Sequence, residues 1–356
     1  MSVSIAVERT RSPKGRPSED KLGFGKVFTD HMFQMNHDAA RGWHSARVVP
    51  YQPLALDPSA SVLHYGQAIF EGMKAFRGTD GKVRLFRPEM NWQRMQASAE
   101  RLCMKFLDRD TFLESLMSLV RADKDWVPKL PGTSLYLRPT LIGTEAFLGV
   151  RPSDEYNFFV IASPVGNYYG EGSEALKIWV EREYSRAAPG GIGAAKAGGN
   201  YASSLAAALA AKEHGFAQVL WLDACEKRFI EEVGTMNVFF RIRDKVVTPA
   251  LSGTILPGVT RDSVLELLRH WGRAVEERPV ELAEIVAAQA RGDLAEIFGT
   301  GTAASISPVG ALGVGEKTLI VNGGKPGALA LELHRALNDI QYGRAPDKLG
   351  WMREVR

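Results

Sequence analysis

The stretch GGIGAAKAGGNYASSL, residues 190–205, places a single lysine, Lys196, in a run of small residues. An alanine-rich segment follows, so we expect the loop to lead into a helix over residues 201–214. Gly198 and Gly199 would let the chain approach a flat ligand closely. A lysine that attacks an aldehyde needs an uncrowded backbone and exclusion from bulk water, which lowers its pKa. Taken alone, however, the loop is better explained as a glycine turn with a solvated lysine.

An acidic pair, Glu231-Glu232, stands at the end of the predicted strand RFIEE and leads into VGTMNVFF. A carboxylate beside a pyridine nitrogen keeps that nitrogen protonated and makes the ring an electron sink for a carbanion. The pair therefore fits a pyridine cofactor, but an exposed acidic pair is also typical of plain solvated surface. These residues by themselves do not decide between the two glutamates.

Two later stretches offer backbone amides to an anion. The sequence GVT at residues 258–260 immediately precedes an amphipathic helix, whose free amides and positive dipole end bind phosphate without a charged side chain. The segment GTGTAAS, residues 299–305, adds a second run of amides with the hydroxyls of Thr300 and Thr302. Arg94 can add a guanidinium fork to the same phosphate. Because every helix has an N-terminus, the first of these signals is weak by itself.

Composition and charge exclude several classes of protein. With 45% hydrophobic and 24% charged residues over 356 positions, the chain has the composition of a soluble globular protein. The net charge of +3 is small and both signs are interspersed, so nucleic acid is not an expected partner. Cys103 and Cys225 form no CxxC motif, and we expect buried free thiols in a reducing compartment. The seven histidines show no paired metal spacing, so we expect no metal site.

The N-terminal segment predicts a cytoplasmic protein. The first twenty residues lack the apolar core of a secretory signal, and their three acidic residues disfavour an organellar transit peptide. The longest run of small apolar residues, 205–211, falls far short of the roughly 20 residues needed to cross a bilayer. We therefore expect a polar tail and no membrane partner.

The length predicts two domains, because cores beyond about 250 to 300 residues tend to split. We expect a mixed α/β (α+β) fold with the active site in the cleft between the domains. The stretch PVGNYYGEGSE is rich in glycine, has little periodicity and marks the boundary. The predicted division is a polar tail at 1–23, a small N-terminal α/β domain at 24–163, an interdomain loop at 164–175 and a large C-terminal domain at 176–356.

Periodicity and capping patterns place the individual elements. In the first predicted helix Met95, Ala99 and Leu102 share a face that should be buried, and Thr111 with Glu114 forms a capping box at the start of the second. Helices are expected over 88–107, from 111, and over 201–214, 261–271 and 280–291. Strands are expected over 135–142, 156–163, 176–180, 218–222, 229–232 and 237–241, with a hairpin turn at 244–245 and a glycine-rich segment at 299–315.

Two glycine-rich stretches resemble nucleotide-binding loops but lack a required feature. In GALGVGEKT, Glu316 separates Gly315 from Lys317, so the adjacent glycine and lysine of a phosphate loop are missing. GTGTAA lacks the third glycine and the early strand of a dinucleotide fingerprint. An NAD-linked oxidoreductase is therefore a distant alternative.

Seven blocks in fixed order resemble one known family. KAGGNYASSL, EEVGTMNVFF, LPGVTRDS and FGTGTAASISPVG resemble the class IV, fold-type IV aminotransferases. LHYGQAIFEGMKAF, LFRPEMNWQRM and SLYLRP narrow the resemblance to the branched-chain aminotransferases. The resemblance runs from about Phe24 to near the C-terminus, and seven ordered blocks are far more specific than a single motif.

The resemblance implies pyridoxal 5'-phosphate as the cofactor. Lys196 would carry it as a Schiff base and act as the catalytic base and acid. Glu232, and not Glu231, would pair with the pyridine nitrogen, and Tyr201 would contact the phenolic oxygen. The phosphate cup that the resemblance implies consists of Arg94, the backbone amides of Val259 and Thr260, and Thr302.

The resemblance also implies the reaction and the substrate pocket. The reaction would be reversible, ping-pong transamination of L-leucine, L-isoleucine and L-valine with 2-oxoglutarate, in branched-chain amino acid biosynthesis or breakdown. The implied pocket consists of Phe24, Tyr65, Tyr136, Arg138, Tyr168, Thr235 and Ala303. Aromatic walls suit an aliphatic side chain, whose burial stabilises by about 0.8 kcal/mol per methylene. Each aromatic taken singly is equally explained by core packing.

The family's dimer implies that Tyr65 reaches across a homodimer interface. One departure from mammalian members is that Ala304 and Ser307 replace the cysteines of a redox CxxC motif, so no thiol switch is expected there. The alternatives within the fold are a D-amino-acid transaminase and an aminodeoxychorismate-lyase-like enzyme, against which the EGMKAF and LYLRP blocks speak. A non-catalytic binding protein of the same fold is the alternative from another class.

Overall fold

The computed structural model describes residues 4–166 and 175–356. The chain forms two compact units. Unit 1 comprises Met1–Gly170, Ala195–Gly198 and Asn338–Arg356, and unit 2 comprises Glu171–Ala194 and Gly199–Leu337. Unit 1 thus includes a four-residue segment around Lys196 and the C-terminal segment. Most of the predicted interdomain loop at 164–175 lies outside the described residues, and the predicted domain limits stay predictions.

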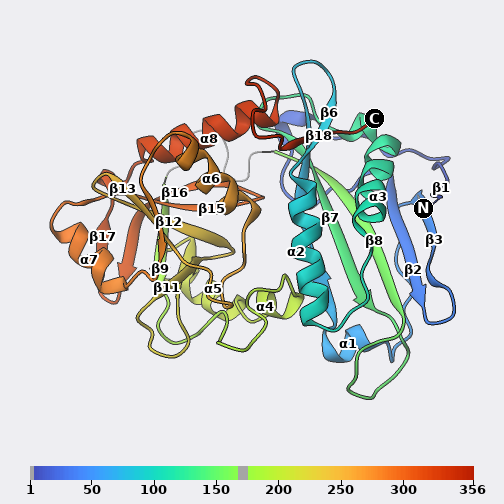
Figure 1. Ribbon diagram of the computed structural model, residues 1–356, viewed down its shortest axis with the longest axis horizontal. Coiled ribbons are helices and arrows are strands. Elements are labelled where there is room, and N and C mark those ends of the chain that lie inside the picture. The colour runs from blue at the N-terminus through green and yellow to red at the C-terminus, as the bar shows by residue number, and fades with distance from the viewer. Residues whose placement is uncertain (1–3, 167–174) are drawn as a thin grey trace. The chain divides into compact units, whose positions relative to one another are not determined.

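Unit 1 is built around one predominantly antiparallel sheet, with order β1-β3-β2-β8-β7-β5-β6-β18 and β4 paired to β7 (Figure 1). The strands are β1 (Ala6–Val7), β2 (His31–Asp38), β3 (Gly42–Pro50), β4 (Ala68–Phe70), β5 (Met73–Arg77), β6 (Val83–Phe86), β7 (Ser134–Gly143), β8 (Tyr156–Val165) and β18 (Met352–Glu354). The helices are α1 (Ser61–Tyr65), α2 (Pro88–Arg101) and α3 (Arg109–Ala122), with 3-10 turns η1 (Glu19–Lys21) and η2 (Lys124–Trp126).

Local sequence explains how the two long helices of unit 1 begin. Pro88 fits the first turn of α2. A backbone N–H at this position has no acceptor within the helix, so the lack of one in proline costs no hydrogen bond. Met95 and Ala99 are buried as predicted, whereas α2 ends at Arg101, six residues before the predicted limit. The predicted capping box is wrong. Asp108 is the N-cap of α3, and its carboxylate accepts a hydrogen bond from the Thr111 amide at 3.0 Å.

Unit 2 contains the second sheet, with order β11-β10-β9-β16-β15-β12-β13-β14 and β17 paired to β16. Its strands are β9 (Leu176–Val180), β10 (Gln218–Leu222), β11 (Ile230–Val233), β12 (Met236–Ile242), β13 (Lys245–Pro249), β14 (Val275–Arg278), β15 (Leu294–Gly301), β16 (Ser305–Val314) and β17 (Lys317–Ile320). The helices are α4 (Gly198–Ala202), α5 (Leu205–Glu213), α6 (Val259–His270), α7 (Leu282–Ala290) and α8 (Ala328–Gln341), with the 3-10 turn η3 (Asn322–Gly324). Helices α4 and α8 each cross the division between the units.

The unit 2 sheet closes on itself. Because β11 also pairs with β12, the strands β11, β10, β9, β16, β15 and β12 form a closed ring, which leaves fewer edges exposed. Alternation along β10 separates two cores: Val219 and Trp221 pack against α5, whereas Leu220 and Leu222 join a larger cluster that includes α7. The sheet is therefore covered on both faces.

The structure corrects three further expectations for unit 2. The helix predicted over 201–214 is interrupted, because α4 ends at Ala202 and α5 begins at Leu205. The hairpin turn lies one residue earlier than predicted, since Ile242 pairs with Lys245 and Arg243 takes a positive φ of 53°. The glycine-rich segment at 299–315 is mainly strand, in the β15–β16 hairpin.

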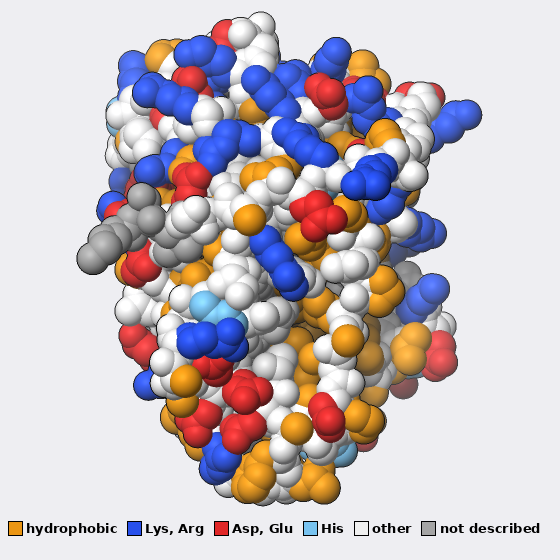
Figure 2. Space-filling view, turned by 90° about the vertical axis from the view of Figure 1, so that its right-hand side faces the viewer, with side chains coloured by type: hydrophobic (Ala, Val, Ile, Leu, Met, Phe, Trp, Pro, Cys, Tyr) orange, Lys and Arg blue, Asp and Glu red, His pale blue; other side chains and the backbone are white. Residues whose placement is uncertain are grey.

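Surface features bear on the expected cellular context. Both cysteines are exposed free thiols, so the prediction that they are buried is wrong. On the face drawn in Figure 2, Lys and Arg side chains are interspersed with Asp and Glu. In the described parts of the chain, no helix has the length and apolar character that a membrane span requires.

Candidate active site

Lys196 is fixed in unit 1 by its own backbone. Its amide donates to Ser98 Oγ on α2 at 2.9 Å, and its carbonyl accepts from the Phe70 amide of β4 at 3.0 Å. The next residue, Ala197, forms an isolated bridge with Ile69 of the same strand. The lysine loop is therefore tied to both a helix and a strand, which fits a residue whose side chain must be held in one place.

The Lys196 amine has an environment suited to a nucleophile. Its Nζ lies 4.9 Å from the centroid of the Phe70 ring. Burial, together with the nearby Arg94 charge, lowers the pKa of Lys196 to about 8, while Glu71 acts in the opposite direction. A larger fraction of this amine is neutral near pH 8 than of an ordinary lysine. The partial burial of Lys196 and its lowered pKa fit a lysine shielded from bulk water better than a fully solvated glycine turn.

Arg94 is buried on α2 and paired with a carboxylate that the sequence reasoning missed. Arg94 Nε donates to Glu71 Oε1 at 2.7 Å, and its NH2 donates to Glu71 Oε2 at 2.8 Å. Glu71 is completely buried, and Asn91 donates a further bond to it at 2.7 Å. A sequence signal was available: Glu71 is a lone acid in the apolar run AIFEGMKAF, and such residues are rarely buried without a partner.

Three predicted pocket residues meet on and beside β7. The ring of Phe24 lies edge-on to that of Tyr136, with centroids 5.0 Å apart. Arg138, two residues along the same strand face, donates to the Tyr136 hydroxyl at 3.0 Å and lies 4.7 Å from the Phe70 ring centroid. The buried Arg138 Nε has no hydrogen-bond partner within the protein. This group therefore offers an aromatic wall and a donor available to an anion.

Lys74 is a second lysine of unit 1 with a perturbed amine. Burial lowers its pKa to about 8. It lies on β5 opposite Tyr136 of β7, so the two side chains share one face of the sheet. Sequence reasoning did not single it out from the EGMKAF block.

In unit 2 the acidic pair is buried, with Glu231 5% and Glu232 3% exposed, so its interpretation as solvated surface is wrong. Glu232 Oε2 lies 2.8 Å from Arg186 Nε, and its Oε1 accepts from the Leu256 amide at 2.8 Å. Glu231 accepts from the Thr254 hydroxyl, and burial raises the pKa of Glu231 above its usual value. The two glutamates therefore differ in character: one is a paired carboxylate and the other favours its neutral form.

The predicted phosphate-binding amides stand at the start of α6. Gly258 is the N-cap, and Val259 and Thr260 begin the helix, both buried. A Cβ on Gly258 would lie 2.0 Å from Asn237 Oδ1, so any other residue here would force the Asn237 side chain to move. Asn237 in turn donates to the Leu256 carbonyl at 2.9 Å and to Glu232 Oε1 at 3.3 Å. Contacts through Asn237 thus link the helix start to Glu232.

The β15–β16 hairpin carries the second predicted run of amides. Thr302 and Ala303 lie in its turn, half-buried. The hydroxyls of Thr300, Ser305 and Ser307 are buried and lack a hydrogen-bond partner within the protein. Buried hydroxyls normally find partners, so this hairpin has spare capacity for a ligand.

The remaining predicted residues are more dispersed. Tyr201 lies in α4, half-buried, and Thr235 is exposed in the β11–β12 turn. Tyr65 ends α1, is exposed, and its hydroxyl donates to the Leu148 carbonyl. Tyr168 lies outside the described residues. Unit 1 thus brings together Lys196, Arg94, Tyr136, Arg138 and Phe24, and unit 2 brings together Glu232 and the α6 start.

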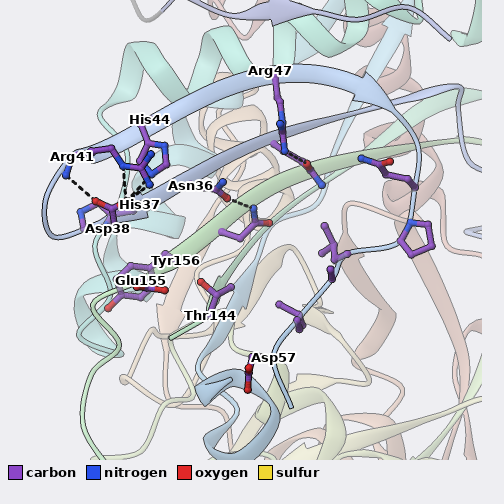
Figure 3. Close-up of a pocket in the computed structure, with 17 residues that line it drawn as sticks. Asn36, His37, Asp38, Arg41, His44, Arg47, Asp57, Thr144, Glu155 and Tyr156 are labelled. Atoms are coloured by element: carbon purple, nitrogen blue, oxygen red, sulfur yellow. Dashed lines mark hydrogen bonds and ion pairs between the residues drawn. The ribbon is translucent and has the colours of Figure 1, made fainter. Parts of the chain in front are cut away.

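Unit 1 also has a polar cavity of about 620 Å³ that contains none of the predicted site residues. It is lined by β2, β3, β8 and the segment around Asp57 (Figure 3). One end of the cavity holds a paired cluster, in which Asp38 accepts from Arg41 Nε at 2.8 Å and lies 3.1 Å from His44 Nε2. Among the described residues, no group of three or more His, Cys, Asp or Glu side chains could hold a metal ion.

Comparison with known proteins gives the family. The family described as amino-transferase class IV matches residues 68–312, which is more than half of the chain. The branched-chain-amino-acid aminotransferase 2 of Bacillus subtilis is 52% identical over 352 residues, covering 99% of this chain and 97% of that protein. The branched-chain-amino-acid aminotransferase of Mycolicibacterium smegmatis is 49% identical over 359 residues, covering 97% and 98%. The chain therefore belongs to the class IV aminotransferases and, among these, to the branched-chain-amino-acid aminotransferases.

Solved structures agree with this assignment. The branched-chain amino acid aminotransferase of Escherichia coli superposes with a TM-score of 0.75 at 28% identity, covering 87% of this chain and 97% of that chain. A second bacterial branched-chain amino acid aminotransferase, solved with pyridoxamine 5'-phosphate, has a TM-score of 0.76 at 26% identity, covering 94% and 99%. The predicted fold-type IV architecture is confirmed by these neighbours.

Proposed function

We propose that the protein catalyses reversible transamination of L-leucine, L-isoleucine and L-valine with 2-oxoglutarate, with pyridoxal 5'-phosphate as cofactor. The products are branched-chain 2-oxo acids and L-glutamate. The observation that carries the proposal is Lys196, whose backbone is held by α2 and β4 and whose pKa is lowered to about 8, in a chain 52% identical to a branched-chain aminotransferase over 99% of its length. No observation on the described residues specifically favours the alternatives, which are a D-amino-acid transaminase, an aminodeoxychorismate-lyase-like enzyme and a non-catalytic binding protein.

The residues present fit this cofactor. A phosphate accepts hydrogen bonds, and the α6 amides and the hydroxyls of the β15–β16 hairpin can donate them. A pyridinium nitrogen needs a buried carboxylate, which Glu232 provides. An aldehyde needs a partly neutral amine, which Lys196 provides. Each functional part of the cofactor therefore has a matching group in the chain.

Residues of unit 1 would handle the amine chemistry and the proton. When bound, the cofactor acts as an electron sink for the carbanion formed at the substrate's α-carbon. Lys196 Nζ takes the α-proton as a general base and returns it as a general acid, for which a pKa near the working pH is best. Arg94, held by Glu71, presents a guanidinium to phosphate.

Residues of unit 2 would hold the cofactor's ring and phosphate. Glu232, supported by Arg186 and the Leu256 amide, would keep the cofactor's ring nitrogen protonated. The amides of Val259 and Thr260 bind phosphate at the dipole end of α6. We propose that Tyr201 would contact the phenolic oxygen and that Thr302 would contact the phosphate.

The substrate's side chain would lie against aromatic groups. Phe24 and Tyr136 present apolar ring surface to an aliphatic chain. Glutamate and 2-oxoglutarate add a carboxylate, and the unpartnered Arg138 Nε provides a polar contact for it. Tyr65, Tyr168, Thr235 and Ala303 remain proposed pocket residues.

The proposal is tested with purified full-length protein and two variants. Wild-type protein should show the visible absorbance of bound cofactor and convert leucine, isoleucine and valine with 2-oxoglutarate. Lys196→Ala should lose both the absorbance and turnover, whereas Lys105→Ala, at a lysine outside the site, should keep both. Turnover of D-alanine in place of the L-amino acids would favour the D-amino-acid transaminase, and activity retained by Lys196→Ala would overturn the proposal.

We also propose a cytoplasmic homodimer. The end of α1 contacts the segment before Arg151 through the Tyr65 hydroxyl and the Leu148 carbonyl, and both segments carry exposed apolar side chains: Leu63, Leu148 and Val150 are 57%, 61% and 86% exposed. Such a patch is costly on a monomer and fits contact with a second copy. The exposed free thiols suit a reducing compartment. Light scattering should give twice the chain mass, and Val150→Glu should lower it; a monomeric wild type would refute the dimer.

A further inference from the structure

Glu71 has no part in the proton transfers proposed above, yet its carboxylate is fully buried and hydrogen-bonded beside unit 1's active-site residues. It is 0% exposed and accepts two bonds from Arg94, one from Asn91 and one from the Gly72 amide at 3.1 Å. Burying a charge is costly unless it is paired and hydrogen-bonded. A carboxylate retained at such a place therefore has a specific task.

The first part of that task is geometric. The two Arg94 bonds use Nε and one terminal nitrogen, an arrangement that fixes the plane of a guanidinium as well as its position. Asn91 and the Gly72 amide fix the carboxylate in turn. Because Glu71 follows β4 and Arg94 lies on α2, the two elements that hold the Lys196 backbone also hold this pair.

The second part is electrostatic. The charged and titratable groups of unit 1 that act on the Lys196 amine include Glu71 after β4, Arg94 on α2, and Tyr136 and Arg138 on β7. Arg94 and Arg138 favour the neutral amine, whereas Glu71 and, to a smaller extent, Tyr136 favour the charged one. Glu71 is thus the carboxylate that balances two guanidiniums beside the reactive lysine.

We propose that Glu71 is a positioning residue, which fixes the Arg94 guanidinium for the cofactor's phosphate and offsets the charge of Arg94 at Lys196. The proposal deepens the proposed function and rests on it. It assigns Glu71 no contact with the substrate or with the reacting atoms. Its effects pass through Arg94 and Lys196.

The electrostatic part is tested on full-length protein freed of cofactor. Amines are labelled by formaldehyde and borohydride at a series of pH values, and the Lys196 peptide is quantified by mass spectrometry. Glu71→Gln keeps the shape but removes the charge, so the labelling midpoint of Lys196 should fall by about one pH unit, as expected for loss of a neighbouring opposite charge. Glu71→Asp should stay close to wild type. Asp123→Asn removes another buried carboxylate, one that pairs with His31 at 2.6 Å, and should leave the midpoint unchanged.

The geometric part is tested by comparing two ligands that differ only in the phosphate. In wild type, pyridoxal 5'-phosphate should bind more tightly than pyridoxal. Glu71→Gln should reduce that preference by about tenfold, because Arg94 is no longer held in place and its charge-assisted contact with the phosphate is weakened. An unchanged or larger preference, or an unchanged Lys196 midpoint, would overturn the proposal. Failure of the wild type to bind pyridoxal 5'-phosphate at all would instead refute the proposed function.

Discussion

The buried pair of Arg186 and Glu232 gives the sharpest stability prediction. The Nε–Oε2 distance is 2.8 Å, and the two side chains are 8% and 5% exposed. Arg186→Met leaves Glu232 without its cation, and removal of one partner from a buried pair costs about 3–5 kcal/mol. The Gly193 carbonyl also loses a donor at 3.1 Å, but Glu232 keeps the Leu256 amide. We therefore expect a loss near the lower end, about 3 kcal/mol.

The assay is urea unfolding of cofactor-free protein followed by circular dichroism. A second variant, Arg186→Met with Glu232→Gln, removes the stranded charge and should be more stable than Arg186→Met alone. Arg186→Lys retains a charge but not the planar fork, and should lose less than Arg186→Met. Two results would refute this description of the pair. One is a stability loss below about 1 kcal/mol for Arg186→Met. The other is a double variant whose stability loss equals the sum of the losses of Arg186→Met and Glu232→Gln measured singly.

Three further predictions follow from single features. Lys196→Met should stabilise the cofactor-free protein by about 3 kcal/mol below pH 8, because the Lys196 amine binds its proton less tightly in the folded than in the unfolded chain. The gain in stability should vanish above pH 10.5, where the amine is neutral in both states. A gain that does not depend on pH would contradict this prediction. Gly258→Ala should weaken pyridoxal 5'-phosphate binding by displacing Asn237, whereas Gly15→Ala, which meets nothing within 4 Å, should bind normally; equal affinities would exclude the clash. Both cysteines should react with a thiol reagent in the folded protein, and one that reacts only after unfolding would show burial.

Strands of unit 2 could be predicted closely because their apolar runs are short and sharply bounded. The predicted limits 176–180 and 218–222 coincide with β9 and β10. Helix ends were less predictable: Asp108 caps α3 although Thr111 with Glu114 offered an equally plausible capping box. The break between α4 and α5 lies at Ser203 and Ser204, whose hydroxyls donate to carbonyls three residues earlier. These side-chain bonds compete with the helical backbone bonds, and helical periodicity in the sequence does not reveal them.

For the site, sequence patterns identified the residue types but not their partners. Lys196 and Glu232 stand in recognisable blocks, yet burial of Glu232 depends on Arg186, forty-six residues earlier in the chain. Glu71 was missed because its role depends on Arg94, a contact made only when α2 packs beside β4. Closure of the unit 2 sheet through the pairing of β11 with β12 is likewise a tertiary property.

The central claim is that Lys196, rather than another lysine, carries the cofactor. Lys74 is the natural competitor, because its pKa is also lowered to about 8 and it lies in the same unit. Treatment of the holoenzyme with borohydride should fix the cofactor to its lysine, and peptide mass mapping identifies the site. A single modified peptide containing Lys196 is the predicted result, whereas modification of Lys74 with Lys196 unlabelled would contradict the account.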